Sequence, residues 1–151
     1  MNVLITNNIL LPALCSWAIA QIAKVIVVLL RDKRLDLRYL FISGGMPSSH
    51  AALVTALAAS IAITEGFGSV AFSIATVFAL IVLYDAAGVR QSVGEQSIAL
   101  NRILQELREQ RPLAEVGRDI REFLGHTEFQ VFMGTIIGIG VAWFWQVVIA
   151  G

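Results

Sequence analysis

The sequence is poor in the residues that mark several other protein classes. It has one cysteine, Cys15, among 151 residues, so no disulfide can form within the chain. Charged residues make up 15% of it, against about 25% in a typical soluble domain. The formal net charge is zero, which gives no bulk attraction to nucleic acid. We therefore expect neither a disulfide framework nor a nucleic-acid partner.

Apolar residues dominate instead. They make up 57% of the chain, and the mean hydropathy is +0.76. Four long apolar segments can be traced, about 8–30, 47–64, 69–87 and 127–150. A helix that spans a bilayer needs about 17–25 such residues. The sequence predicts an all-α fold: an integral membrane four-helix bundle in a single domain, residues 1–151, with a short second span.

Positive charge is confined to two of the connecting segments. Four of the eleven Lys and Arg residues lie between the first two spans and six between the third and fourth. Neither terminus carries any, nor does the link at 65–68. With four spans, both basic loops fall on one side, and the positive-inside rule makes that side cytoplasmic. Both termini are then expected on the opposite side.

The segment 91–125, between the third and fourth spans, has helical periodicity. Apolar residues recur at near-helical spacing on both sides of Pro112, and Gly125 supplies a stop signal. This pattern predicts one or two amphipathic helices on the cytoplasmic surface. Their apolar faces are expected to cover the bundle or the lipid surface, with a dedicated partner site as the less favoured alternative.

Two ionisable residues lie within predicted spans, where charge is costly and often functional. Gln21, Lys24 and Arg31 are spaced three and seven residues apart, which places them on one helix face. Lys24 either serves a site within the bundle or extends to the interface, as long basic side chains do. Asp85, near the end of the third span, either contributes to a site or pairs with Lys24 or Arg90.

The chain has two histidines, and each stands near the start of a predicted helix. In the stretch GGMPSSH, which ends at His50, Pro47 is expected in the first helical turn. The free N–H groups of that turn, together with the helix dipole, favour an anion. His126 precedes the fourth span, where Thr127 and Gln130 have the spacing of a capping box.

The topology brings these features to one side of the membrane. The first and third spans end there, and the second and fourth begin there. Cations, two histidines and two helix N-termini together suit a dianionic phosphate, with the histidines as nucleophile and acid. The candidate residues on that side are Lys24, Arg31, Ser48, Ser49, His50, Asp85, Arg90 and His126.

Several motifs resemble those of one known group. The Lys24 to Arg31 spacing, the run Pro47-Ser48-Ser49-His50 inside GGMPSSHAA, and the stretches YDAAGVRQ and LGHT carry the likeness. The chain resembles the divergent branch of the phosphatidic acid phosphatase type 2 superfamily, also called acid phosphatase/vanadium-dependent haloperoxidase-related proteins. The likeness covers most of the chain.

This resemblance implies a metal-independent, cofactor-free phosphatase acting on a phosphorylated lipid in the bilayer. It implies that His126 attacks phosphorus and forms a phosphohistidine, while His50 protonates the leaving oxygen. The phosphate-binding residues would be Lys24, Arg31, Ser48, Ser49 and Arg90.

The chain also departs from the superfamily pattern. Asp32 replaces a proline after Arg31, and Gln130 stands where an aspartate would orient the nucleophilic histidine. Ile120 occupies the position of an arginine, with Arg121 beside it. Asp85, Gln130 and Arg121 are therefore candidates for orienting roles that the motifs leave open.

The departures keep a second hypothesis in view. A non-catalytic membrane subunit or assembly factor could retain the phosphatase-like fold without its chemistry. It would work as a homo-oligomer or with a partner in a membrane complex. A small transporter is less favoured, because the polar residues gather at one end and trace no path across the membrane.

Overall fold

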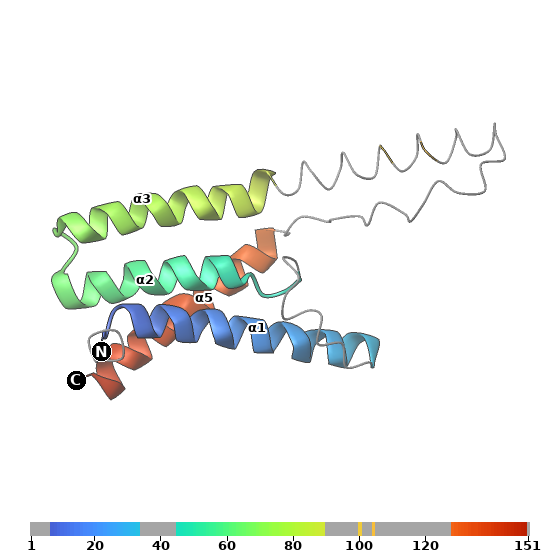
Figure 1. Cartoon of the computed structure of the whole chain (residues 1–151), viewed down its shortest axis with the longest axis horizontal. Coiled ribbons are helices and arrows are strands. Elements are labelled where there is room, and N and C mark those ends of the chain that lie inside the picture. The colour runs from blue at the N-terminus through green and yellow to red at the C-terminus, as the bar shows by residue number, and fades with distance from the viewer. Residues whose placement is uncertain (1–6, 34–44, 90–99, 101–103, 105–127, 151) are drawn as a thin grey trace.

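The computed structural model describes residues 7–33, 45–89, 100, 104 and 128–150. Among these residues there are four long helices and no strand (Figure 1). The helices are α1 Leu10–Asp32, α2 Ser49–Glu65, α3 Val70–Tyr84 and α5 Glu128–Phe144. Two short π-helices extend the last two of them, η2 Asp85–Val89 and η3 Trp145–Ile149. The predicted all-α bundle is confirmed, whereas the predicted amphipathic segment 91–125 lies outside the described residues except for Leu100 and Leu104.

Three of the helical segments are long and apolar enough to cross a membrane: Leu10–Leu30, Val70–Ala87 and Phe129–Ile149. α2 is apolar too but has 17 residues. The outward surfaces carry many large apolar side chains; Leu30, Val70 and Ile81 are 75%, 76% and 62% exposed. Such a surface suits lipid and not water. The chain is an integral membrane protein, as its composition predicts.

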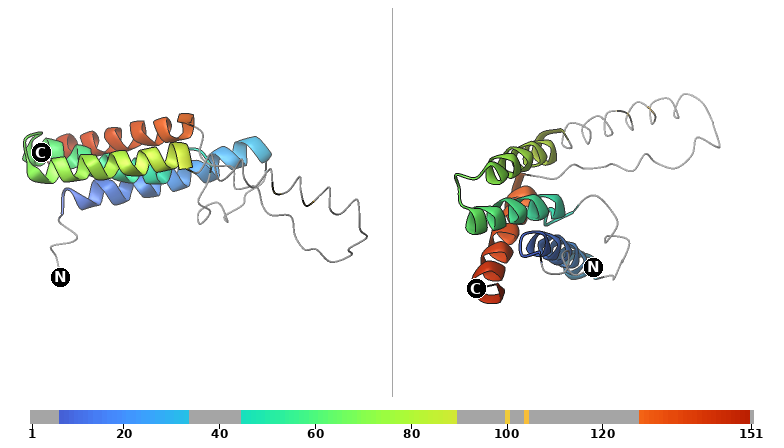
Figure 2. Two further views of the ribbon diagram at one scale, coloured as in Figure 1. Left: turned by 90° about the horizontal axis from the view of Figure 1, so that it is seen from above. Right: turned by 60° about the vertical axis from the view of Figure 1, so that its left-hand side comes forward.

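α2 is the central helix of the bundle. It contacts α1, α3 and α5, and α5 crosses behind α2 and α1 (Figures 1 and 2). More than half of the α2 residues are buried, and most of these are small: Ser49, Ala51, Ala52, Val54, Thr55, Ala56, Ser60, Ile61 and Ala62. A helix that is apolar all round is expected at such a position. Small side chains let three neighbours approach it closely.

Two glycines bring α5 against α2. A Cβ atom at Gly138 would overlap the Thr55 hydroxyl and the Ala52 carbonyl oxygen, and one at Gly134 would overlap the Ser48 carbonyl oxygen. The two glycines are four residues apart, so they lie on the same face of α5. This spacing is a common means of close helix contact in membranes. It places the beginning of α5 directly beside the beginning of α2.

α1 meets α2 through a stripe of small and polar residues. Ala13, Ser16, Ala20 and Lys24 recur at intervals of three or four and are each at most 1% exposed. The Ser16 hydroxyl donates to the Ala52 carbonyl oxygen at 2.9 Å, and lies 2.8 Å from the Ala13 carbonyl oxygen in its own helix. This contact fixes the position of α1 along the axis of α2. It therefore determines which residues of the two helices lie at the same height in the bundle.

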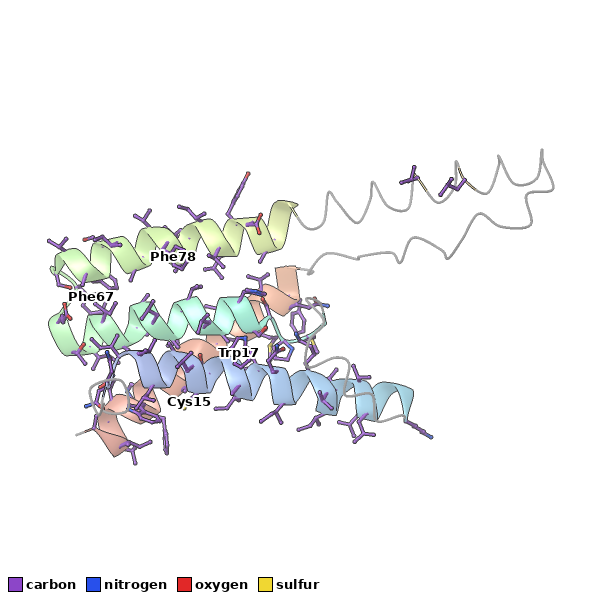
Figure 3. The ribbon with its side chains drawn as sticks, viewed as in Figure 1. Cys15, Trp17, Phe67 and Phe78 are labelled. Atoms are coloured by element: carbon purple, nitrogen blue, oxygen red, sulfur yellow. The ribbon has the colours of Figure 1, made fainter. Side chains whose placement is uncertain are left out.

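The opposite end of the bundle is held by separate contacts. There the Gln146 amide donates to the Asn8 carbonyl oxygen, which joins the two ends of the described chain. Phe67 lies at the turn between α2 and α3 (Figure 3). Its ring meets that of Phe72 edge to face at 5.2 Å. We call the end of the bundle that contains Asn8, Gln146 and the α2–α3 turn the termini end, and the opposite end the loop end. The candidate site residues that the structure describes lie toward the loop end.

Candidate functional site

Four helical segments have an end on the loop side of the bundle. α1 and α3 run toward it, whereas α2 and α5 begin there (Figure 1). A buried cluster of Ala51, Ala86 and Val131 joins the first turn of α2 to η2 and to the first turn of α5. The sequence-based prediction that these helix ends share one side of the bundle is therefore confirmed.

Lys24 lies inside the bundle. Its side chain is 1% exposed, and its Nζ donates to Gln21 Oε1 at 2.8 Å. Gln21 is one turn closer to the termini end, so the ammonium turns inward. The alternative that Lys24 extends to the interface is wrong. Lys24 precedes the end of α1 at Asp32 by about 12 Å along the helix axis, so this cation is recessed within the bundle.

Gly45, in the GGMPSSH stretch, lies over this lysine. Gly45 has a φ of +87°, a conformation that glycine adopts readily. A Cβ atom there would lie 3.2 Å from Lys24 Cγ and 3.3 Å from Lys24 Cδ. The backbone of Gly45 thus covers the methylene stem of Lys24. The chain changes direction here with a glycine conformation and encloses a cation.

Ser48, not Pro47, marks the start of α2. The helix begins at Ser49, and the Ser48 hydroxyl caps it by accepting the Ala51 N–H at 3.4 Å. The Ser48 N–H donates to the Gln130 carbonyl oxygen at 3.0 Å. The prediction that Pro47 lies in the first helical turn is therefore wrong. The reason is tertiary: the bond to Gln130 uses the N–H of the residue after the proline and orients it as a cap.

Exposure differs sharply along the motif. Ser48 and Ser49 are buried, at 0% and 3% exposure, whereas His50 is exposed. Ala51, after it, is buried at 0%. His50 is therefore the exposed side chain at this helix start, between buried neighbours. Ser48 and Gln130 are adjacent through their backbones, so the GGMPSSH stretch contacts the first turn of α5 at this point.

Asp85 lies apart from the buried lysine. Its side chain is exposed, and within the described part of the chain it forms no ion pair. The alternative that Asp85 pairs with Lys24 is wrong, because η2 turns Ala86 and not Asp85 into the buried cluster at the loop end.

The structure does not describe every candidate. The side chain of Arg31 and the whole of Arg90, Arg121 and His126 lie outside the described residues. Among the residues that are described, no group of three or more His, Cys, Asp or Glu could hold a metal ion. The site that can be built thus contains Lys24, the turn at Gly45, the α2 start and Gln130.

Two features of the site were not identified from the sequence. Gln21 was placed on the face of Lys24, but its role as acceptor for the ammonium depends on the burial of the Lys24 side chain. The contact of Gly134 with Ser48 was also missed. The signal for it was present, since Gly134 and Gly138 have the four-residue spacing of close helix pairs.

Capping by Ser48 leads to a testable prediction. Ser48→Ala is expected to lower the free energy of unfolding by about 1 kcal/mol, the usual cost of a lost cap. Ser69 caps α3 in the same way, accepting the Phe72 N–H at 3.1 Å, but lies at the termini end. Ser69→Ala should cost a similar amount. Thermal unfolding in detergent compares the stability of the two variants. Unchanged stability in Ser48→Ala would contradict the capping role.

Comparisons with known proteins give a family and a relative for this chain. The profile of the divergent PAP2 family matches residues 5–141. The chain is 37% identical over 145 residues to a protein from Bacillus subtilis (strain 168) described as "Uncharacterized membrane protein YuiD". That alignment covers 90% of this chain and 92% of the Bacillus protein. No solved structure matches the chain.

Proposed function

Because the chain belongs to the divergent PAP2 family, we propose that it is a membrane-embedded phosphatase that removes phosphate from a phosphorylated lipid. One observation carries the proposal: Lys24, at 1% exposure, lies beneath the turn that leads into α2. A positive charge and the positive end of a helix dipole are thus placed together within an apolar bundle. Each favours an anion, and a phosphate group between them would satisfy both.

Phosphate binding would draw on groups from two helices. The Lys24 ammonium neutralises charge, and the first-turn N–H groups of α2 donate to phosphate oxygens. Arg31, about 10 Å further along α1, and Arg90 complete the charge at the loop end. In a site of low dielectric such contacts are stronger than in water, and they strengthen as charge develops in the transition state.

The chemical step would use the two histidines. A ring nitrogen of His126 attacks phosphorus, a P–N bond forms, and the P–O bond to the lipid breaks. His50 gives its proton to the departing oxygen, so the lipid alcohol leaves neutral. Water then attacks the phosphohistidine, with His50 taking its proton, and releases inorganic phosphate. The exposed position of His50 is consistent with access of a leaving group and of water.

A lipid substrate fits the surroundings of this site. The exposed apolar surfaces of α1 and α3 leave room for hydrocarbon tails in the bilayer beside the loop end. The head group would enter from the side of the basic loops, which the positive-inside rule places in the cytoplasm. The proposal therefore includes a cytoplasmic site, with both termini across the membrane.

Purified protein in mixed micelles tests the proposal by release of inorganic phosphate. Phosphatidic acid, phosphatidylglycerophosphate and a prenyl phosphate are the substrates to compare. Release from at least one of them, above that of a mock purification, is the expected result. No release from any of the three would contradict the phosphatase function.

The non-catalytic alternative rests on a specific feature. Gln130 can hold an imidazole by a hydrogen bond, but it cannot stabilise an imidazolium by charge as an aspartate would. A subunit or assembly factor would therefore keep the fold while losing the chemistry. It predicts a stable complex with another membrane protein, or with a second copy, and full cellular function when both His50 and His126 are replaced.

A further inference from the structure

The charged end of Lys24 is held by an amide. Nζ donates to Gln21 Oε1 at 2.8 Å, and both residues lie within the apolar stretch Leu10–Leu30. Lysine near a membrane boundary usually extends toward water, because its long stem allows the ammonium to reach the interface. Here it does not, although Arg31 and Lys33 lie only two turns further along. Something in the bundle therefore fixes its direction.

The stem of Lys24 is held by the backbone of the motif. Gly45 lies against Cγ and Cδ, where a Cβ atom would be 3.2 and 3.3 Å away. Contacts of this kind constrain the methylenes but do not by themselves fix the direction of the ammonium. The direction of the ammonium then depends on what accepts its hydrogen bonds, and Gln21 is one such acceptor.

The position of Gln21 places the ammonium near the start of α2. α1 and α2 are antiparallel, with Ser16 bonded to Ala52 and Lys24 against Gly45. Gln21, one turn before Lys24, therefore lies at about the same height along the bundle axis as Ser48. An ammonium turned toward Gln21 lies near the level of the α2 N-terminus, and one turned away would move toward the basic loop.

We propose that Gln21 is a positioning residue, which holds the Lys24 ammonium inside the bundle at the level of the α2 N-terminus. The consequence of this positioning for phosphate binding rests on the proposed phosphatase function. The positioning itself does not, because it concerns only the hydrogen bond between two residues of α1. The two parts can therefore be tested separately.

Amine labelling tests the positioning without any enzyme assay. The chain has only two lysines, Lys24 and Lys33, and Lys33 is exposed at the end of α1. An acetylating N-hydroxysuccinimide ester, read by mass spectrometry, gives the labelling rate of Lys24 relative to Lys33. In the wild-type protein we expect Lys24 to react at least about tenfold more slowly, since reaction requires local opening. In Gln21→Leu the ratio should rise several-fold.

A matched control comes from the termini end. Gln146 also carries a hydrogen-bonded side-chain amide; it is 9% exposed and donates to the Asn8 carbonyl oxygen. Gln146→Leu also removes a side-chain amide, but at a position far from Lys24. It should therefore leave the labelling ratio unchanged. Equal ratios in the wild type and Gln21→Leu would overturn the proposal. So would equal increases in Gln21→Leu and Gln146→Leu, because these would indicate general loosening.

Kinetics test the consequence for phosphate, with Gln21→Glu as the second variant. A glutamate keeps the acceptor, so Lys24 should stay protected from labelling, but its negative charge cancels that of the ammonium. Both Gln21→Leu and Gln21→Glu should therefore raise KM for the lipid phosphate several-fold. An unchanged KM in both variants would contradict the role in phosphate binding. A wild-type protein that releases no phosphate would contradict the proposed function, while the labelling ratio would still decide the positioning.

Discussion

Alanine in place of His126 is expected to abolish phosphate release from the lipid substrate. Without the nucleophile no phosphohistidine forms, so the loss should exceed the about 10²–10⁴-fold that one general acid–base group contributes. Wild-type protein quenched during turnover with radiolabelled substrate should carry acid-labile phosphate, and His126→Ala should carry none. The chain has two histidines, so the label can be assigned by peptide mapping.

His50→Ala provides the contrasting variant. Loss of the general acid should reduce release from a lipid alcohol by about 10²–10⁴-fold. The reduction should be much smaller with p-nitrophenyl phosphate, because its phenolate leaves without needing a proton. Release that persists when both histidines are replaced would reject this mechanism and favour the non-catalytic subunit.

Alanine at Gly138 is expected to destabilise the bundle strongly. Its Cβ would overlap the Thr55 hydroxyl and the Ala52 carbonyl oxygen, so α5 would have to move away from α2. Overpacking of this kind costs about 1–3 kcal/mol and occasionally more. It would exceed the gain of up to about 1 kcal/mol that alanine brings to a helix interior. Unfolding in mixed micelles measures the free-energy change.

Gly140 supplies the control in the same helix. A Cβ atom there would meet nothing within 4 Å. Gly140→Ala should therefore be neutral or stabilising by up to about 1 kcal/mol, from helix propensity alone. Equal effects at Gly138 and Gly140 would show that the close approach of α5 to α2 contributes little to stability.

The start of α2 illustrates the limit of local sequence rules. A proline followed by two serines permits several starts, because proline suits the first turn and serine suits the cap. Ser48 becomes the cap because its N–H bonds to Gln130, far away in sequence. No pattern within GGMPSSH contains that partner, so the prediction placed the helix start at Pro47.

Lys24 shows the same limit for a side chain. The spacing of Gln21, Lys24 and Arg31 identifies a shared helix face, because helical periodicity is a local property. Whether that face meets lipid, water or protein depends on the neighbouring chain. Gly45 and α2 enclose Lys24, and this enclosure turns a residue that could extend outward into a buried cation.

Hydrophobic segments and their lengths were sufficient to predict the membrane class, the helices and the common side of their loop ends. Each of these follows from apolar transfer energies and helix geometry, which act residue by residue along the chain. The pairing of Ser48 with Gln130, the cover of Gly45 over Lys24 and the exposure of His50 arise differently. They depend on which faces of α1, α2 and α5 meet, and small residues at distant positions decide that through close packing.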